Sequence, residues 1–152
     1  MQRILLASHG TTGARAAELV AVNRLQSGDQ LIHLQVVPDF WDGMQGDDWL
    51  NNASTRDVFA DYVENSLEVE ARITFDRVAA LVAQRAAKCE IRLVYDKPAY
   101  ALLKAVAAVV PDLVIIGAPR PKYAEGLNSK MLTEAMLRSM VVPLLVIPYP
   151  DV

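Results

Sequence analysis

The sequence predicts an α/β fold, a single doubly wound domain over residues 1–152 with a five-stranded parallel sheet. Five short apolar runs alternate with helical patterns, and such alternation forms right-handed βαβ units whose sheet is covered on both faces. Two of the runs, Leu113–Gly117 and Leu144–Pro148, are almost purely apolar, as buried parallel strands are. The length of 152 residues allows one full hydrophobic core.

Each predicted strand is an apolar run, and in chain order the runs are Arg3–Ser8, Gln30–Val37, Glu90–Tyr95, Leu113–Gly117 and Leu144–Pro148. We expect the strand order 3-2-1-4-5, which places the topological switch point between the first and fourth strands. Ligands of open α/β sheets bind at the carboxyl ends of strands beside that point. A ligand crevice is therefore expected between the turn after Ser8 and the loop after Gly117.

About four helices are predicted on the two faces of the sheet. The first has Thr11 or Thr12 as its cap and runs to about Gln26. Its buried face is formed by residues three or four apart, namely Ala14, Ala17, Ala21 and Leu25. The second helix begins near Ser54 or Thr55 and is expected to continue to about Lys88. Its stripe has the same spacing and consists of Val63, Leu67, Ala71, Thr74, Val78 and Leu81.

The two remaining helices are shorter. Pro98 suits the first position of a helix that reaches about Val109, and Pro111 ends it. Asn128 or Ser129 is expected to cap the last helix. Within that helix the apolar residues recur at intervals of four: Leu132, Met136 and Met140.

Composition excludes several classes of function. The formal net charge of −3 gives no general attraction to nucleic acid or to an anionic membrane. Cys89 is the only cysteine, so an internal disulfide is impossible, and a structural thiol in a reducing compartment is expected. The first residues do not form a signal peptide, and no apolar run approaches the ~18 residues of a membrane span. We expect a cytoplasmic protein with no membrane partner and no nucleic-acid partner.

Six stretches in this order and spacing resemble the universal stress protein family over nearly the whole chain: Ile4-Leu-Leu-Ala-Ser-His-Gly-Thr11, Leu34-Gln-Val-Val37, Tyr95-Asp-Lys-Pro98, Asp112-Leu-Val-Ile-Ile-Gly117, Thr133-Glu-Ala-Met-Leu-Arg138 and Val142-Pro-Leu-Leu-Val-Ile147. The resemblance implies an α/β domain that takes part in cytoplasmic stress tolerance, usually as a homodimer paired through its last strand. It also implies a test for nucleotide binding, because many members bind ATP through a glycine motif after the fourth strand.

That motif, G-x2-G-x9-G-[ST], is largely missing here. Bare backbone amides and a helix N-terminus cradle phosphates in such motifs, and side chains obstruct the approach. Laid on this chain without gaps, its first glycine is Gly117, but the following positions are Arg120, Lys130 and Met131. The aspartate with which ATP-binding members end the first strand is His9 here. The sequence predicts a divergent member without ATP binding of the family type and without a cofactor.

In an alternative interpretation, the crevice between the first and fourth strands binds a nucleotide or another anion. Its candidate cofactor-binding residues are His9, Gly10, Gly117, Arg120 and Lys130. Here Arg120 and Lys130 would replace the motif glycines and bind ATP, another adenine nucleotide or another small anionic ligand, and weak ATP hydrolysis belongs to this alternative. The simpler alternative is a solvated loop whose charges bind nothing specific.

No catalytic or metal-binding residues are predicted. His9 at the crevice is a weak candidate for a general base or a metal ligand. The only other histidine, His33, lies on the second strand, so spacing indicates no metal cluster. We therefore predict a protein that is not an enzyme and that acts through a protein partner or through a divergent ligand.

The last strand is the predicted dimer edge, formed by Val142, Leu144, Leu145, Val146 and Ile147. An apolar strand at a sheet edge is an aggregation hazard unless it is covered or paired. Pairing with its own copy across a twofold axis removes the hazard and yields a homodimer.

Segment 38–52, with Trp41, Trp49 and four aspartates, is expected to be a long loop that either contacts a partner or folds over the core.

Overall fold

The computed structural model describes residues 1–8, 12–37, 53–118 and 131–150, and in two helices the first side chains (12–13, 53–65 and 67) lie outside this description. Strands and helices alternate along the chain: β1 (Arg3–Ser8), α1 (Thr12–Arg24), β2 (Gln30–Val37), α3 (Ala53–Gln84), β3 (Lys88–Tyr95), α4 (Pro98–Val109), β4 (Leu113–Gly117), α5 (Glu134–Ser139) and β5 (Leu144–Ile147). No helix in these ranges is long and apolar enough to cross a membrane.

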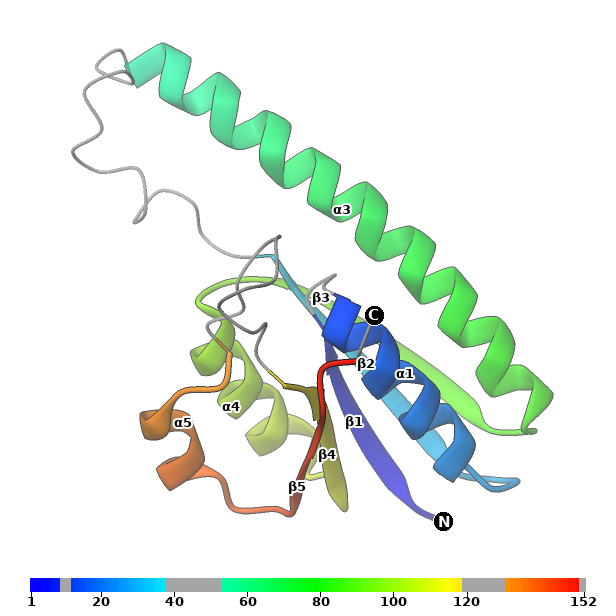
Figure 1. Cartoon of the computed structure of the whole chain (residues 1–152). Helices are drawn as coiled ribbons and strands as arrows, with labels where there is room; N and C mark the ends of the chain where they lie inside the picture. The colour runs from blue at the N-terminus through cyan, green and yellow to red at the C-terminus, as the bar shows by residue number, and fades with distance from the viewer. Residues whose placement is uncertain (9–11, 38–52, 119–130, 151–152) are drawn as a thin grey trace.

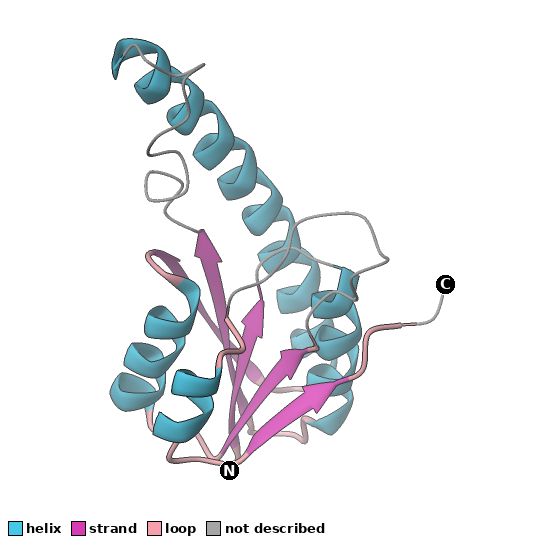
Figure 2. Cartoon of the chain, turned by 60° about the vertical axis from the view of Figure 1, so that its left-hand side comes forward, coloured by secondary structure: helices cyan, strands magenta, loops and turns pink. Residues whose placement is uncertain are grey.

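The five strands form one parallel sheet in the order β3-β2-β1-β4-β5. Helices α1 and α3 cover one face of this sheet, and α4 and α5 cover the other (Figures 1 and 2). The predicted α/β class, the strand order and the four helices are therefore confirmed. The switch point lies between β1 and β4, as predicted.

Each face of the sheet has its own hydrophobic core, because successive strand side chains point to opposite faces. On β1, Leu5 and Ala7 pack with α4 and α5, whereas Ile4 and Leu6 pack with α1 and α3. The predicted stripe of α1 is fully buried, with Ala14, Ala17, Ala21 and Leu25 each at most 3% exposed. Among the predicted residues of α3 that are described, Ala71 and Val78 are buried.

The predicted start of the last helix is wrong. Asn128 and Ser129 lie outside the described residues, but α5 begins only at Glu134, with Thr133 as its cap. The Thr133 hydroxyl accepts a hydrogen bond from the Met136 amide at 3.1 Å, which satisfies one of the free amides of the first turn. Met131 precedes the helix and is fully buried.

Smaller differences from the prediction concern the residue at which α3 ends and the residue at which β3 begins. Helix α3 ends at Gln84 rather than near Lys88, and β3 begins at Lys88 rather than at Glu90. The cause is Ala86, whose φ of 55° is the left-handed conformation that stops helices. Its carbonyl accepts a hydrogen bond from the Gly28 amide at 3.0 Å, which ties the end of α3 to the turn before β2. Lys88 and Cys89 are thereby free to extend β3.

Helix α3 is much longer than the sheet that it covers. Its 32 residues span about 48 Å, whereas the eight residues of β2 span about 26 Å. Figure 1 shows the first half of the helix extending past the carboxyl ends of the strands. The second half, from Ala71 to Val82, supplies the residues that pack on the sheet.

Candidate functional site

The carboxyl ends of β1 and β4 lie side by side at the switch point. Ala7 of β1 is in register with Ile116 of β4, so Ser8 and Gly117 end neighbouring strands. The Ala118 amide donates a 2.8 Å hydrogen bond to the Ile147 carbonyl, which holds the start of the following segment against β5. Gly117 is thus at the predicted place. The other predicted crevice residues lie outside the described residues: His9, Gly10, Arg120 and Lys130.

A buried polar cluster lies just below this edge, on the face covered by α1 and α3. The Gln35 side-chain amide donates to the Ser8 hydroxyl at 3.0 Å, and its Nε2 atom lies 3.3 Å from His33 Nε2. All three side chains are at most 2% exposed. This cluster was not among the sites predicted from the sequence. Its only signal is that the polar residues of β2, His33 and Gln35, are two apart and therefore point to the same face.

His33 is enclosed between the sheet and α3. Its ring contacts the Phe75 ring edge to face, with centroids 5.0 Å apart and an interplanar angle of 84°. Burial, with a smaller effect from the positive charge of Arg77, lowers the pKa of His33 from 6.5 to about 4. The imidazole is therefore neutral at pH 7, and its Nδ1 atom has no hydrogen-bond partner within the described part of the chain.

An ion pair joins the two helices above this cluster. Arg77 of α3 donates to Glu18 of α1 at 2.7 Å, and Glu18 is only 4% exposed. Burial raises the pKa of Glu18, while Arg77 and then Arg15 oppose that rise. The pair fixes the packing of α1 against α3.

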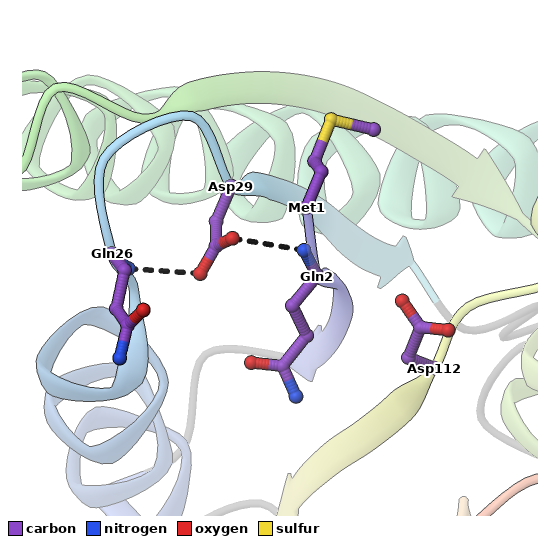
Figure 3. Close-up of a pocket in the computed structure, with 5 residues that line it drawn as sticks. All are labelled: Met1, Gln2, Gln26, Asp29 and Asp112. Atoms are coloured by element: carbon purple, nitrogen blue, oxygen red, sulfur yellow. Dashed lines mark hydrogen bonds between the residues drawn. The ribbon is translucent and has the colours of Figure 1, made fainter.

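A shallow polar hollow of about 470 Å³ lies at the opposite end of the sheet (Figure 3). Its two carboxylates already hold backbone amides. Asp29 accepts from the amides of Gln2 and Gln26 at 2.8 Å each, and Asp112 accepts from the Arg3 amide at 2.8 Å. The bonds from Gln2 and Gln26 lower the pKa of Asp29. Because this hollow lies at the amino ends of the strands, away from the switch point, we assign it a structural role.

The described residues contain no group of three or more His, Cys, Asp or Glu that could hold a metal ion. Cys89 is half-buried, and burial raises the pKa of its thiol. A raised pKa disfavours the reactive thiolate. This environment agrees with the structural role expected for Cys89.

Comparison with known families decides the identity of the fold. The model of the universal stress protein family matches residues 1–148. The chain belongs to the universal stress protein family. No curated protein sequence matches it. The likeness to solved universal stress proteins lies in the fold, because their sequence identities to this chain are low.

Three solved universal stress proteins have this fold. One is UspA from Lactobacillus plantarum, with 19% identity, a TM-score of 0.71 and coverage of 96% of this chain and 97% of the other. A family member from Burkholderia pseudomallei has 20% identity, a TM-score of 0.66 and coverage of 97% and 96%. A third, from Arabidopsis thaliana with AMP bound, has 13% identity, a TM-score of 0.62 and coverage of 99% and 93%.

In this universal stress protein, Met131 has a structural place that its sequence position did not reveal. The ungapped motif puts Met131 where ATP-binding members have Ser or Thr. The side chain is 0% exposed and packs in the core between the sheet and helices α4 and α5. The residue therefore contributes apolar contacts to the core.

The predicted dimer edge of this universal stress protein is an outer strand of the sheet. The amides of Val114 and Ala118 donate to the carbonyls of Pro143 and Ile147, at 2.9 and 2.8 Å. Backbone groups alternate in direction along a strand, so Leu144 and Val146 turn their N–H and C=O groups away from β4. These groups face the open edge.

Apolar side chains accompany that open backbone. Val146 is 37% exposed, and Val141, just before the strand, is 84% exposed. The remaining predicted edge residues, Val142, Leu144, Leu145 and Ile147, are partly buried and pack against the two cores. The edge thus combines a free backbone with exposed apolar surface.

Proposed function

We propose that this chain is a homodimeric universal stress protein of the cytoplasm that does not bind ATP through the family's glycine motif. It acts in the stress response through a protein partner or a divergent small ligand, and not as an enzyme. The observation that carries the proposal is the burial of Met131, at the motif position where a hydroxyl group would meet the phosphates. The net charge of −3 supports the absence of a nucleic-acid partner. The single cysteine supports a reducing compartment.

A phosphate cradle needs donors that can approach the ligand. Met131 offers no side-chain donor, and turning it out of the core would cost about 1.5–3 kcal/mol of hydrophobic burial. Arg120 and Lys130 replace two further motif glycines, so the sequence there supplies long side chains in place of bare backbone. These changes affect three of the four motif positions.

The rival proposal is nucleotide binding in which Arg120 and Lys130 replace the glycines. It deserves a direct test because an Arabidopsis member of the same fold has AMP bound. Calorimetric titration of the purified chain with ATP, ADP and AMP separates the two. We expect no saturable heat at nucleotide concentrations up to about 1 mM, which corresponds to a binding free energy weaker than about −4 kcal/mol. Saturable binding in the micromolar range would overturn the proposal.

If binding is found, paired variants identify its source. Arg120→Ala and Lys130→Ala should abolish binding when side-chain charge holds the phosphates. Lys122→Ala, a charge removal in the same segment but at a position outside the motif, is the matched control.

Replacing Met131 by serine tests the carrying observation itself. The substitution restores the hydroxyl of the motif but removes a fully buried side chain. We expect the free energy of unfolding to fall by about 2–5 kcal/mol, with no gain of ATP binding. Denaturant unfolding and calorimetry measure the two effects. A variant of unchanged stability that binds ATP would show that Met131 occupies the phosphate site and not the core.

The dimer is proposed to form through β5. Antiparallel pairing about a twofold axis near Leu145 would place Leu144 opposite Val146 of the second copy. Each such pair exchanges two hydrogen bonds between the outward backbone groups. Pro148 carries no N–H, so pairing is confined to a short stretch.

A further inference from the structure

The contacts of His33 are those of its neutral form. The ring fills the space between β2 and Phe75 of α3, and Gln35 links its Nε2 atom to Ser8 at the end of β1. With Nε2 accepting from the Gln35 amide, the proton of the neutral ring lies on Nδ1. The cluster thus connects helix α3 to two strands through a single titratable group.

The protonated form is more costly. An imidazolium donates from both nitrogens. Its Nε2 proton would face the Gln35 amide group that donates to it in the neutral form, so this amide would have to rotate and present its oxygen. Nδ1 donates in both forms and has no acceptor in the described part of the chain, but in the protonated form this unpartnered donor belongs to a buried cation. A buried charge without a partner costs more than a buried neutral N–H, and the added cost is relieved when the contact with Phe75 opens to water.

The charges that face His33 also oppose its protonation. From α3 the nearest is Arg77, a like charge that lowers the pKa of His33. On α1, Glu18 is already paired with Arg77, and the charge of Arg15 also acts on Glu18. The neighbouring strands add no carboxylate on this face: β1 contributes Ser8, and the β3 residues in register with His33 and Gln35 are Ile91 and Leu93.

We propose that His33 is an acid-sensitive contact that holds α3 on the sheet, and that its protonation releases the packed half of α3 from β2 and β3. The released state exposes Phe75 and the underlying apolar strand residues, which gives an acidified cell a different surface of this protein. The β4–β5 side of the sheet lacks such a histidine within its described residues and keeps its packing. The proposal is independent of the nucleotide question.

Amide hydrogen exchange of the full chain at pH 7.5 and pH 5 tests this, with rates corrected for the intrinsic effect of pH. With a pKa of 6.5 in the open state and about 4 in the closed state, opening of α3 should be about 30-fold more frequent at pH 5. The increase should affect Ala71 to Val82 and β3, while β4 changes little. Equal protection of α3 at the two pH values overturns the proposal.

Variants separate His33 from the other acid-titrating groups. His33→Phe, which keeps an aromatic ring at this position but cannot be protonated, should lose the 30-fold increase. His9→Gln, at the only other histidine of the chain, is the matched control and should retain it. Glu18→Gln should also retain it, because a raised carboxylate pKa favours the folded state on acidification and has the opposite sign. An unchanged increase in His33→Phe overturns the proposal.

A second measurement covers the case in which His33→Phe does not fold. Imidazole NMR signals of the wild-type protein are assigned by comparison with His9→Gln and followed from pH 8 to pH 4.5. We expect His33 to remain neutral in the folded signals while unfolded or open signals grow. A folded His33 that titrates near pH 6.5 without any change in α3 overturns the proposal.

Discussion

The two edges of the sheet differ in length and in charge. Strand β3 has eight residues and β5 has four, yet the longer edge is the charged one. Lys88, Glu90 and Arg92 alternate along β3, and Glu90 pairs with Arg92 at 3.6 Å. Strand β5 consists only of Leu, Val and Ile. Charged residues on an edge strand discourage pairing with another chain, so β5 is the edge that is open to it.

Backbone direction adds to this difference. The hydrogen bonds from the Lys88 amide to Asp29 and from the Asp96 amide to Val37 show that the even-numbered residues of β3 face β2. The odd-numbered ones, such as Ile91, turn their backbone to the outside. Each edge therefore has free backbone groups, and the contrast lies in the side chains that flank them. Charge, rather than the supply of hydrogen bonds, distinguishes the two edges.

The largest expected effect follows from blocking β5. Val146→Pro removes an outward N–H from each copy but leaves the bonds from β5 to β4 intact. The loss of two hydrogen bonds and of the valine contacts, about 2 kcal/mol in total, should raise the dimer dissociation constant roughly 30-fold. Analytical ultracentrifugation over a dilution series measures it.

The matched control lies on the other edge. Ile91→Pro also removes an outward N–H, but from β3, and should leave the association state unchanged. Similar weakening by both substitutions would show that β5 is not the pairing edge.

A smaller effect is expected from removing the charges of β3. Glu90→Val combined with Arg92→Val makes this edge resemble β5, so we expect concentration-dependent association beyond the dimer, visible by light scattering. Glu134→Val with Arg138→Val removes an exposed Glu–Arg pair from helix α5 and controls for the change in hydrophobicity. If both double variants associate equally, general hydrophobicity and not the sheet edge is responsible.

The smallest effect concerns the carboxylates that anchor each side of β1. Asp29, on the β3 side, holds two backbone amides, whereas Asp112, on the β5 side, holds one. Asp29→Asn should therefore lower the thermal midpoint more than Asp112→Asn does. The hydrogen bonds that lower the pKa of Asp29 stabilise the fold above pH 3.8, and this contribution is lost as the pH falls through the lowered value.

Thermal unfolding from pH 7 to pH 2 measures both the order of the thermal midpoints of the two variants and the pH dependence that Asp29 contributes. The Asn variant of Asp29 should lose less stability than the wild type below pH 3.8. Equal acid sensitivity of the two proteins would indicate that Asp29 does not anchor the sheet.

The strands were predictable because each is a short apolar run. Their alternation with helices indicated a doubly wound parallel sheet, and the observed strand order is the common one for such sheets. The start of α5 was not, because Ser129 and Thr133 are both suitable caps and only tertiary packing buries Met131 before the helix. The end of α3 depends on the left-handed Ala86, a residue type that rarely adopts this conformation.

The candidate site was predictable in part. The position of Gly117 at the switch point follows from strand order alone. The Ser8–Gln35–His33 cluster was missed because Ser8 is far from the other two residues in sequence and becomes their neighbour only when β1 and β2 pair in register. Two polar residues at alternate positions of an otherwise apolar strand, His33 and Gln35, are the sequence signal that could have indicated this cluster.

Native mass spectrometry of the chain as purified from cells tests the proposed dimer and the proposed lack of ATP binding together, because one spectrum reports both association and bound nucleotide. We expect a species of twice the chain mass without any adduct of nucleotide mass, also after incubation with ATP. A monomer at micromolar concentration, or a dimer that carries one nucleotide per chain, would contradict it.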